Sequence, residues 1–134
     1  MKYFSNVVFI LLFLGCKNSS VKTIKETTFY VGTYTQKESK GIYTYSISKN
    51  GKLKNIGVAA AITNPSFLAK SKDNKTLFAV SEIDENGTGF VHSYEIKKDA
   101  LHFINKQESG GAHPCFIAVN EANYIITANY TGGN

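Results

Sequence analysis

The feature that most constrains the fold is an internal repeat, because the chain matches itself when it is shifted by 49 residues. "NPSFLAK" at 64–70 falls on "HPCFIAV" at 113–119, and "KTLFAVS" at 75–81 falls on "YIITANY" at 124–130. Repeats of roughly 40–50 residues occur in β-propellers and in helical arrays. No stretch carries a helical period, and apolar residues alternate with polar ones instead. The sequence therefore predicts an all-β protein made of propeller blades.

One period reads as four strands separated by turn-forming residues such as "KDN" and "DENG". We expect these strands at 65–71, 75–82, 88–96 and 100–108. Three earlier strands match the second to fourth of this blade, at 27–34, 40–48 and 52–60. Two strands of a third blade follow before Asn134. Propellers close with about 4–8 blades, so we expect the N-terminal two to two and a half blades of a longer β-propeller; the alternative is a ring assembled from several short chains.

The charge distribution argues against a nucleic-acid partner. All fifteen basic residues are lysines, which give a formal net charge of +5. Arginine, the usual residue for bidentate contacts to phosphate and guanine, is absent. The lysines are spread singly or in pairs along the sequence, as expected for solvated turns and strand edges.

The N-terminus predicts export. Lys2 precedes an apolar run at 3–14, which is too short to span a bilayer but fits the core of a signal peptide at 1–15. Gly15-Cys16 resembles the lipobox of bacterial lipoproteins, in which Cys16 would be lipidated and 16–27 would be a polar tether. Phe13 departs from that motif, which prefers leucine. An ordinary secretory signal and an uncleaved anchor remain alternatives; the favoured location is the cell envelope, in the periplasm or on the outer membrane, held by a lipid anchor.

Several motifs resemble one family of propellers. They are "VGTYT" at 31–35, "NPSFLA" at 64–69, "AVSE" at 79–82 and "ANYTGG" at 128–133. In this order they resemble the lactonase family of seven-bladed β-propellers, which includes 6-phosphogluconolactonases of the propeller type and the fungal 3-carboxy-cis,cis-muconate lactonizing enzyme. The resemblance runs from Phe29 to Asn134, about the first third of a family member.

The resemblance implies chemistry on a sugar-acid or carboxylic-acid lactone at one mouth of the central channel. The histidine and arginine residues proposed for catalysis in the family would lie beyond Asn134, so no catalytic residue is assigned within this chain. Many members also carry histidine where this chain has Phe116. An exported protein would not meet 6-phosphogluconolactone, which is made in the cytosol, and a different lactone is expected. The alternative is a non-catalytic envelope propeller that binds a ligand or a protein partner.

Antiparallel strands place the start of the first strand and the end of the second at the same rim. Glu82, His113, Asn129 and Tyr130 are therefore the candidate substrate-binding residues, and Asn64 and Ser66 share their rim. Each has a structural alternative: a salt bridge near a turn for Glu82, a strand cap for His113, and a tight turn before Gly132-Gly133 for the last two.

Other chemistry has little support in the sequence. Cys115 is the only cysteine beyond Cys16, so no intramolecular disulfide is expected. A buried structural thiol is favoured over a nucleophile. His92 and His102 are interpreted as packing or surface residues. No metal-ligand spacing, phosphate-binding loop or nucleophile elbow is present, and we predict neither metal nor cofactor.

Overall fold

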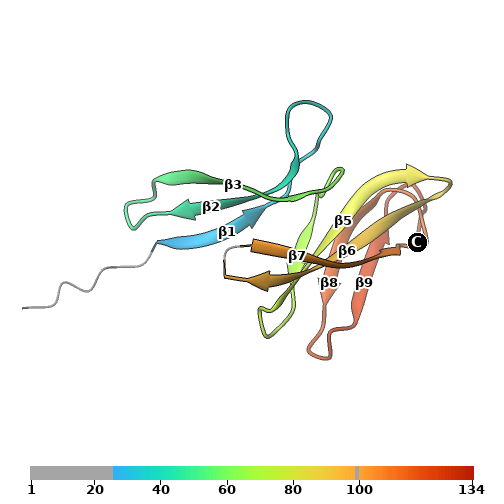
Figure 1. Cartoon of the computed structure of the whole chain (residues 1–134). Coiled ribbons are helices and arrows are strands. Elements are labelled where there is room, and N and C mark those ends of the chain that lie inside the picture. Colours follow the sequence, from blue (N-terminus) through green and yellow to red (C-terminus); the bar gives the residue numbers. More distant parts are fainter. Residues whose placement is uncertain (1–25, 99) are drawn as a thin grey trace, which may run out of the picture.

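The computed structural model describes residues 26–98 and 100–134, and every regular element in this part of the chain is a β-strand (Figure 1). The strands are β1 (Thr27–Val31), β2 (Gly41–Ile47), β3 (Leu53–Ala61), β4 (Leu68–Lys70), β5 (Thr76–Glu85), β6 (Thr88–Lys97), β7 (Ala100–Glu108), β8 (Pro114–Val119) and β9 (Ile125–Asn129). The all-β prediction is confirmed. The described residues contain no helix long and apolar enough to cross a membrane. The predicted signal peptide at 1–15, Cys16 and most of the tether lie outside the described residues.

The strands form three antiparallel sheets that follow one another along the chain. Their orders are β1-β2-β3, β4-β5-β6-β7 and β8-β9. The four strands predicted for one full period make the complete sheet, and the flanking sheets hold the strands expected of a first and a third blade. This arrangement is part of a β-propeller, as predicted.

The repeat is not uniform along a blade. Leu68 pairs with Ala79, whereas Ile117, 49 residues after Leu68, pairs with Thr127. The second strand of a blade therefore repeats after 48 residues, although the first repeats after 49. A slip of one residue turns every side chain of a strand to the other face. The alignment of Ala79 with Ala128 was wrong for this reason.

Two strand boundaries differ from the sequence prediction because of local backbone bonding. The first strand of the complete blade begins at Leu68 instead of residue 65, because Pro65 has no N–H and the Ser66 amide bonds to the Asn64 carbonyl (2.8 Å). The second strand continues to Glu85, since pairing resumes with Thr88 after an irregularity that follows Ser81.

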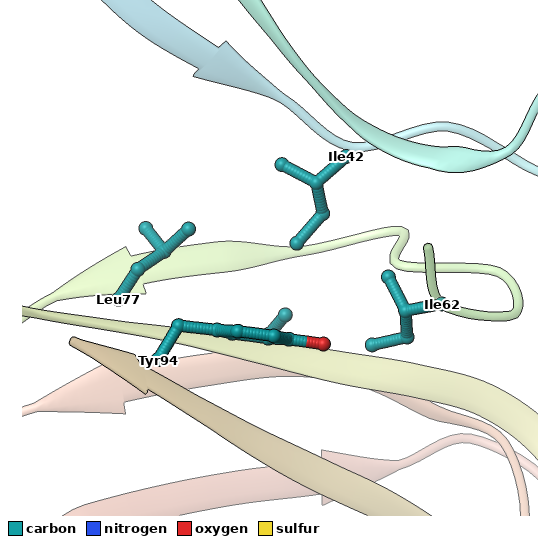
Figure 2. Close-up of a cluster of buried hydrophobic side chains, with 5 residues drawn as sticks. Ile42, Ile62, Leu77 and Tyr94 are labelled. Carbon is teal, nitrogen blue, oxygen red and sulfur yellow. The ribbon is translucent and has the colours of Figure 1, made fainter. Parts of the chain in front are cut away.

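The core lies between the sheets, as expected when flat blades stack face to face. Between the first and second sheets it consists of Ile42, Ile62, Leu77, Ala79 and Tyr94, whose labelled members converge in Figure 2. Between the second and third sheets it consists of Phe78, Val80, Val91 and Ile117. Burying each large side chain contributes about 1.5–3 kcal/mol. Because neighbouring residues of β5 face opposite cores, this strand joins the three sheets.

Glycines permit the closest approaches between sheets. A Cβ atom on Gly32 would lie 1.9 Å from the Pro65 carbonyl oxygen, and one on Gly89 would lie 2.2 Å from Cδ of Pro114. No side chain fits at either position. The Gly32 contact places the end of β1 beside the loop that leads into β4, and the Gly89 contact places the start of β6 beside the start of β8.

Candidate functional site

The candidate site is on the end of the sheets where the first strand of a blade starts and the second ends; we call it the mouth. It is formed by residues 32–40, 62–67, 82–87, 109–113 and 130–134. The 48-residue repeat of the second strands gives Tyr34, Glu82 and Tyr130 the same position in three successive sheets. These three side chains therefore belong to one rim.

A hydrogen bond across two sheets joins the first two of these rim residues. The Tyr34 hydroxyl donates to Oε2 of Glu82 at 2.8 Å. Tyr34 is 53% exposed and Glu82 is half-buried. The bond to Glu82 is the main reason that the pKa of Tyr34 is raised above its ordinary value, so the phenol stays protonated and remains a donor. In the described part of the chain, no lysine forms an ion pair with Glu82.

Asn64 fixes the backbone beneath this pair. Its Oδ1 accepts hydrogen bonds from the amide (2.9 Å) and hydroxyl (3.1 Å) of Thr35, and its Nδ2 donates to the Glu82 carbonyl (3.3 Å). The Glu82 amide returns a bond to the Asn64 carbonyl (3.0 Å). Asn64 has a φ of 45°, a left-handed conformation that asparagine tolerates better than most residues. One side chain thus holds the loop after β1 against β5.

His113 occupies the position in the third sheet that Asn64 has in the second, and it shares the left-handed conformation, with a φ of 54°. Its amide donates to the Ile83 carbonyl (3.0 Å), which places it beside the residue that follows Glu82. Nδ1 lies 2.9 Å from the Thr131 hydroxyl. Nε2 has no hydrogen-bond partner among the described residues. The Nδ1 contact therefore orients the half-buried imidazole and leaves Nε2 unbonded among the described residues.

Asn129 and Tyr130 form no hydrogen bond with Tyr34 or Glu82 in the described part of the chain. The Asn129 side chain is 4% exposed and donates to the Ser109 carbonyl (3.1 Å) and to Oδ1 of Asn134 (3.2 Å). Its own Oδ1 is buried without a hydrogen-bond partner in the described part of the chain. Tyr130 is 82% exposed, and its amide bonds to the His113 carbonyl (2.9 Å). The structure thus joins His113 to Ile83, the residue after Glu82, through one backbone bond and places Asn129 beneath the rim.

Two further groups lie beside Tyr34. The Ser66 hydroxyl oxygen is buried without a hydrogen-bond partner among the described atoms, and it opposes part of the rise in the pKa of Tyr34. Cys115 follows Pro114 as Ser66 follows Pro65, and its Sγ lies 3.7 Å from the Ala128 carbonyl oxygen. The thiol is free among the described residues and half-buried, so the expectation of a buried cysteine was wrong.

A shallow hollow borders this part of the mouth. Its volume is about 350 Å³, and its lining includes Thr35, Ser39, Lys40 and Thr63. Thr35 is the residue that bonds to Asn64. Within residues 26–98 and 100–134, no group of three or more histidine, cysteine or carboxylate side chains is placed to hold a metal ion.

Sequence analysis missed Tyr34, Thr35 and Thr131 as site residues. The 49-residue alignment set Tyr34 against Ile83, an apolar residue. The 48-residue register of the second strands sets it against Glu82, and that register was the signal that could have identified it.

Comparisons with known proteins point to one group of propellers. The family model described as "Lactonase, 7-bladed beta-propeller" matches residues 28–134. A 6-phosphogluconolactonase of Bacillus subtilis is 38% identical over 108 residues, which cover 78% of this chain and 30% of the relative. A 6-phosphogluconolactonase of Formosa agariphila is 30% identical over 107 residues, which cover 76% of this chain and 30% of the relative. The chain therefore spans about 30% of the length of these curated relatives.

Solved structures give the same result. A candidate 6-phosphogluconolactonase from Bacteroides fragilis superposes with a TM-score of 0.73 and 38% identity, over 83% of this chain and 31% of that structure. The Pseudomonas aeruginosa periplasmic gluconolactonase superposes with a TM-score of 0.70 and 30% identity, over 79% of this chain and 31% of that structure.

Proposed function

The chain belongs to the lactonase family of seven-bladed β-propellers, and we propose that the complete protein hydrolyses a sugar-acid or carboxylic-acid lactone at the mouth. The observation that carries this proposal is the Tyr34–Glu82 pair. It holds one carboxylate at the rim, on the side of the molecule where loops from three sheets meet.

Lactone hydrolysis needs an acceptor for a proton of the attacking water and a donor for the oxyanion that develops on the carbonyl. Oε2 of Glu82 is occupied by Tyr34, and Oε1 has no partner among the described residues. Oε1 is the proposed acceptor, either for a hydroxyl of the lactone or for the proton of the attacking water. That water then adds to the carbonyl carbon, the ring C–O bond breaks, and the leaving oxygen takes up a proton.

The other rim residues are proposed to bind substrate. Nε2 of His113 and the hydroxyl of Tyr130 lack partners among the described residues and lie at the same end of the sheets. Asn129 is proposed to support these residues from below, where its Oδ1 is buried. Replacing His113 with alanine is expected to raise KM more than it lowers kcat, because His113 is assigned to binding the substrate and not to stabilising the transition state.

Export is the second part of the proposal. Residues 1–15 would act as a signal peptide, Cys16 would carry lipid, and 16–27 would tether a propeller domain that begins at residue 28 in the cell envelope. A related fold in the periplasmic gluconolactonase of Pseudomonas aeruginosa supports this location. An unphosphorylated lactone fits it better than a phosphorylated one from the cytosol. Incorporation of labelled palmitate that is lost in Cys16→Ser would support the anchor; equal labelling would refute it.

The activity test uses glucono-δ-lactone and the protein expressed from its complete gene. We expect decay faster than in buffer, and a fall in kcat/KM of about 100-fold or more in Glu82→Gln, the usual effect of losing a positioned proton acceptor. Glu85→Gln is the matched control, because it removes the same charge from an exposed position on the same strand.

Lactone decay equal to that in buffer would instead favour the non-catalytic envelope propeller. Full activity in Glu82→Gln would retain the lactonase but reject the assigned acceptor.

A further inference from the structure

The lysines that are scattered along the sequence gather at one end of the folded chain. This end, opposite the mouth, holds the β2–β3, β4–β5, β6–β7 and β8–β9 turns. In Figure 1 the β2–β3 turn lies on the left, and the β4–β5 and β8–β9 turns lie at the bottom. Eight exposed lysines lie in or beside these turns: Lys49, Lys52, Lys54, Lys70, Lys72, Lys75, Lys97 and Lys98. We call this the basic end. The repeat explains it, because equivalent turns of successive blades meet on one side of a propeller.

The two ends carry formal charges of opposite sign. Among the described residues, the basic end sets its eight lysines against four carboxylates, Glu26, Asp73, Glu95 and Glu121, which leaves +4. The mouth and the strand ends beside it set three lysines against five carboxylates, which leaves −2; these are Lys37, Lys40 and Lys106 against Glu38, Glu82, Asp84, Glu85 and Glu108. The molecule is therefore polarised along the strand direction.

Most lysines at the basic end are not neutralised by neighbours. Three of them form ion pairs, Lys72 with Glu121 (2.8 Å), Lys75 with Asp73 (3.8 Å) and Lys97 with Glu95 (2.7 Å). These pairs are exposed, so they hold their partners weakly. Within the part of the chain that the structure describes, the other five form no ion pair: Lys49, Lys52, Lys54, Lys70 and Lys98.

The chain also enters the fold at this end. Thr27, the first residue of β1, pairs with Ile47, the last residue of β2, and the β2–β3 turn follows directly. The 25 residues before Glu26 contain the apolar run at 3–14 and, after it, three more lysines: Lys17, Lys22 and Lys25. The apolar segment and the basic end are therefore joined by a short, positively charged stretch.

We propose that the basic end faces a bilayer whose surface carries anionic phospholipid headgroups, and that the mouth opens away from it. A basic surface close to a hydrophobic anchor adds an electrostatic attraction to anionic headgroups and determines which end of the domain faces them. Lysine suits this role, because its ammonium group acts as a point charge toward a diffuse layer of phosphates. Arginine, by contrast, binds a single phosphate through two parallel hydrogen bonds. The proposal holds whether or not the mouth hydrolyses a lactone.

The test compares partition of the complete protein between vesicles of neutral phosphatidylcholine and vesicles that contain about one-third phosphatidylglycerol. The basic-end variant combines Lys49→Gln, Lys52→Gln and Lys98→Gln. The matched control removes the same charge from the other end, with Lys37→Gln, Lys40→Gln and Lys106→Gln. Thermal unfolding of both variants confirms that they are folded.

We expect wild type and control to prefer the anionic vesicles, and the basic-end variant to lose at least about tenfold of that preference. Raising the salt to about 0.5 M should remove the preference, because it shortens the screening length. Equal loss in the control, an unchanged preference in the basic-end variant, or no preference in wild type would overturn the proposal. So would lysine-dependent binding to double-stranded DNA without binding to the anionic vesicles.

Discussion

Replacing Ile42 with alanine tests the packing on which the position of the mouth depends. Ile42 lies on β2, is 0% exposed, and packs between the first two sheets against Leu77, Ala79 and Tyr94. The Tyr34–Glu82 bond and the bonds from Thr35 to Asn64 cross this same junction between sheets. Loosening the junction therefore affects both stability and the site.

The magnitude follows from the atoms removed. Ile42→Ala deletes three carbons, and at about 0.8 kcal/mol for each buried carbon the lost transfer energy is about 2.4 kcal/mol. A residual cavity of about 50 Å³ would add about 1.2 kcal/mol at about 24 cal/mol per Å³. The free energy of unfolding should fall by about 3–4 kcal/mol, a large part of the 5–15 kcal/mol that a typical domain possesses.

Urea unfolding of the complete protein measures the change, and the slope with denaturant should stay constant while the midpoint falls. Leu53→Ala is the matched control, because Leu53 begins β3 in the same sheet but is 57% exposed; it should cost less than about 0.5 kcal/mol. A loss of less than about 1 kcal/mol in Ile42→Ala, or an equal loss in both variants, would refute the packing described between the first two sheets.

Three other perturbations test separate features by the same unfolding measurement. Gly89→Ala should cost about 1–3 kcal/mol, because its Cβ would meet the rigid ring of Pro114 at 2.2 Å, and unchanged stability would contradict that contact. Burial, assisted by a nearby lysine, lowers the pKa of His92 to about 4. Between pH 6.5 and 4 the unfolded chain therefore binds a proton that the folded chain does not. The full shift corresponds to about 3 kcal/mol, and solvent screening of the half-buried ring reduces the expected loss to about 1–2 kcal/mol as the pH falls, in wild type and His102→Gln but not in His92→Gln. Lys72→Ala should change stability by less than about 0.5 kcal/mol, since both members of its ion pair are exposed, and a larger loss would show that this pair stabilises the junction of two turns.

The fold could be predicted from the sequence because its signals are local and repeated. Alternating apolar residues and turn-forming residues located all four strands of the complete blade, within a few residues at each end. The one-residue slip could not be predicted. Ala79 and Ala128 are the same residue type, but strand pairing gives Thr127 the position that is equivalent to Ala79. Only strand pairing determines which face of the sheet a residue occupies.

The site was harder to predict, because its contacts join residues far apart in the sequence. Glu82 and His113 were proposed from their positions at the ends of strands. Tyr34 was missed, since its bond to Glu82 spans 48 residues and crosses two sheets. The basic end was missed for a related reason: single lysines in separate turns form a common surface only after the blades have stacked.

A crystal structure of the complete protein with bound gluconate tests the central claim most directly. We predict a gluconate oxygen within about 3.2 Å of the Glu82 carboxylate at the mouth, with the phenol of Tyr34 still donating to the same carboxylate. Gluconate bound elsewhere, with Glu82 and His113 facing only solvent, would contradict the assignment of the mouth as the lactone site.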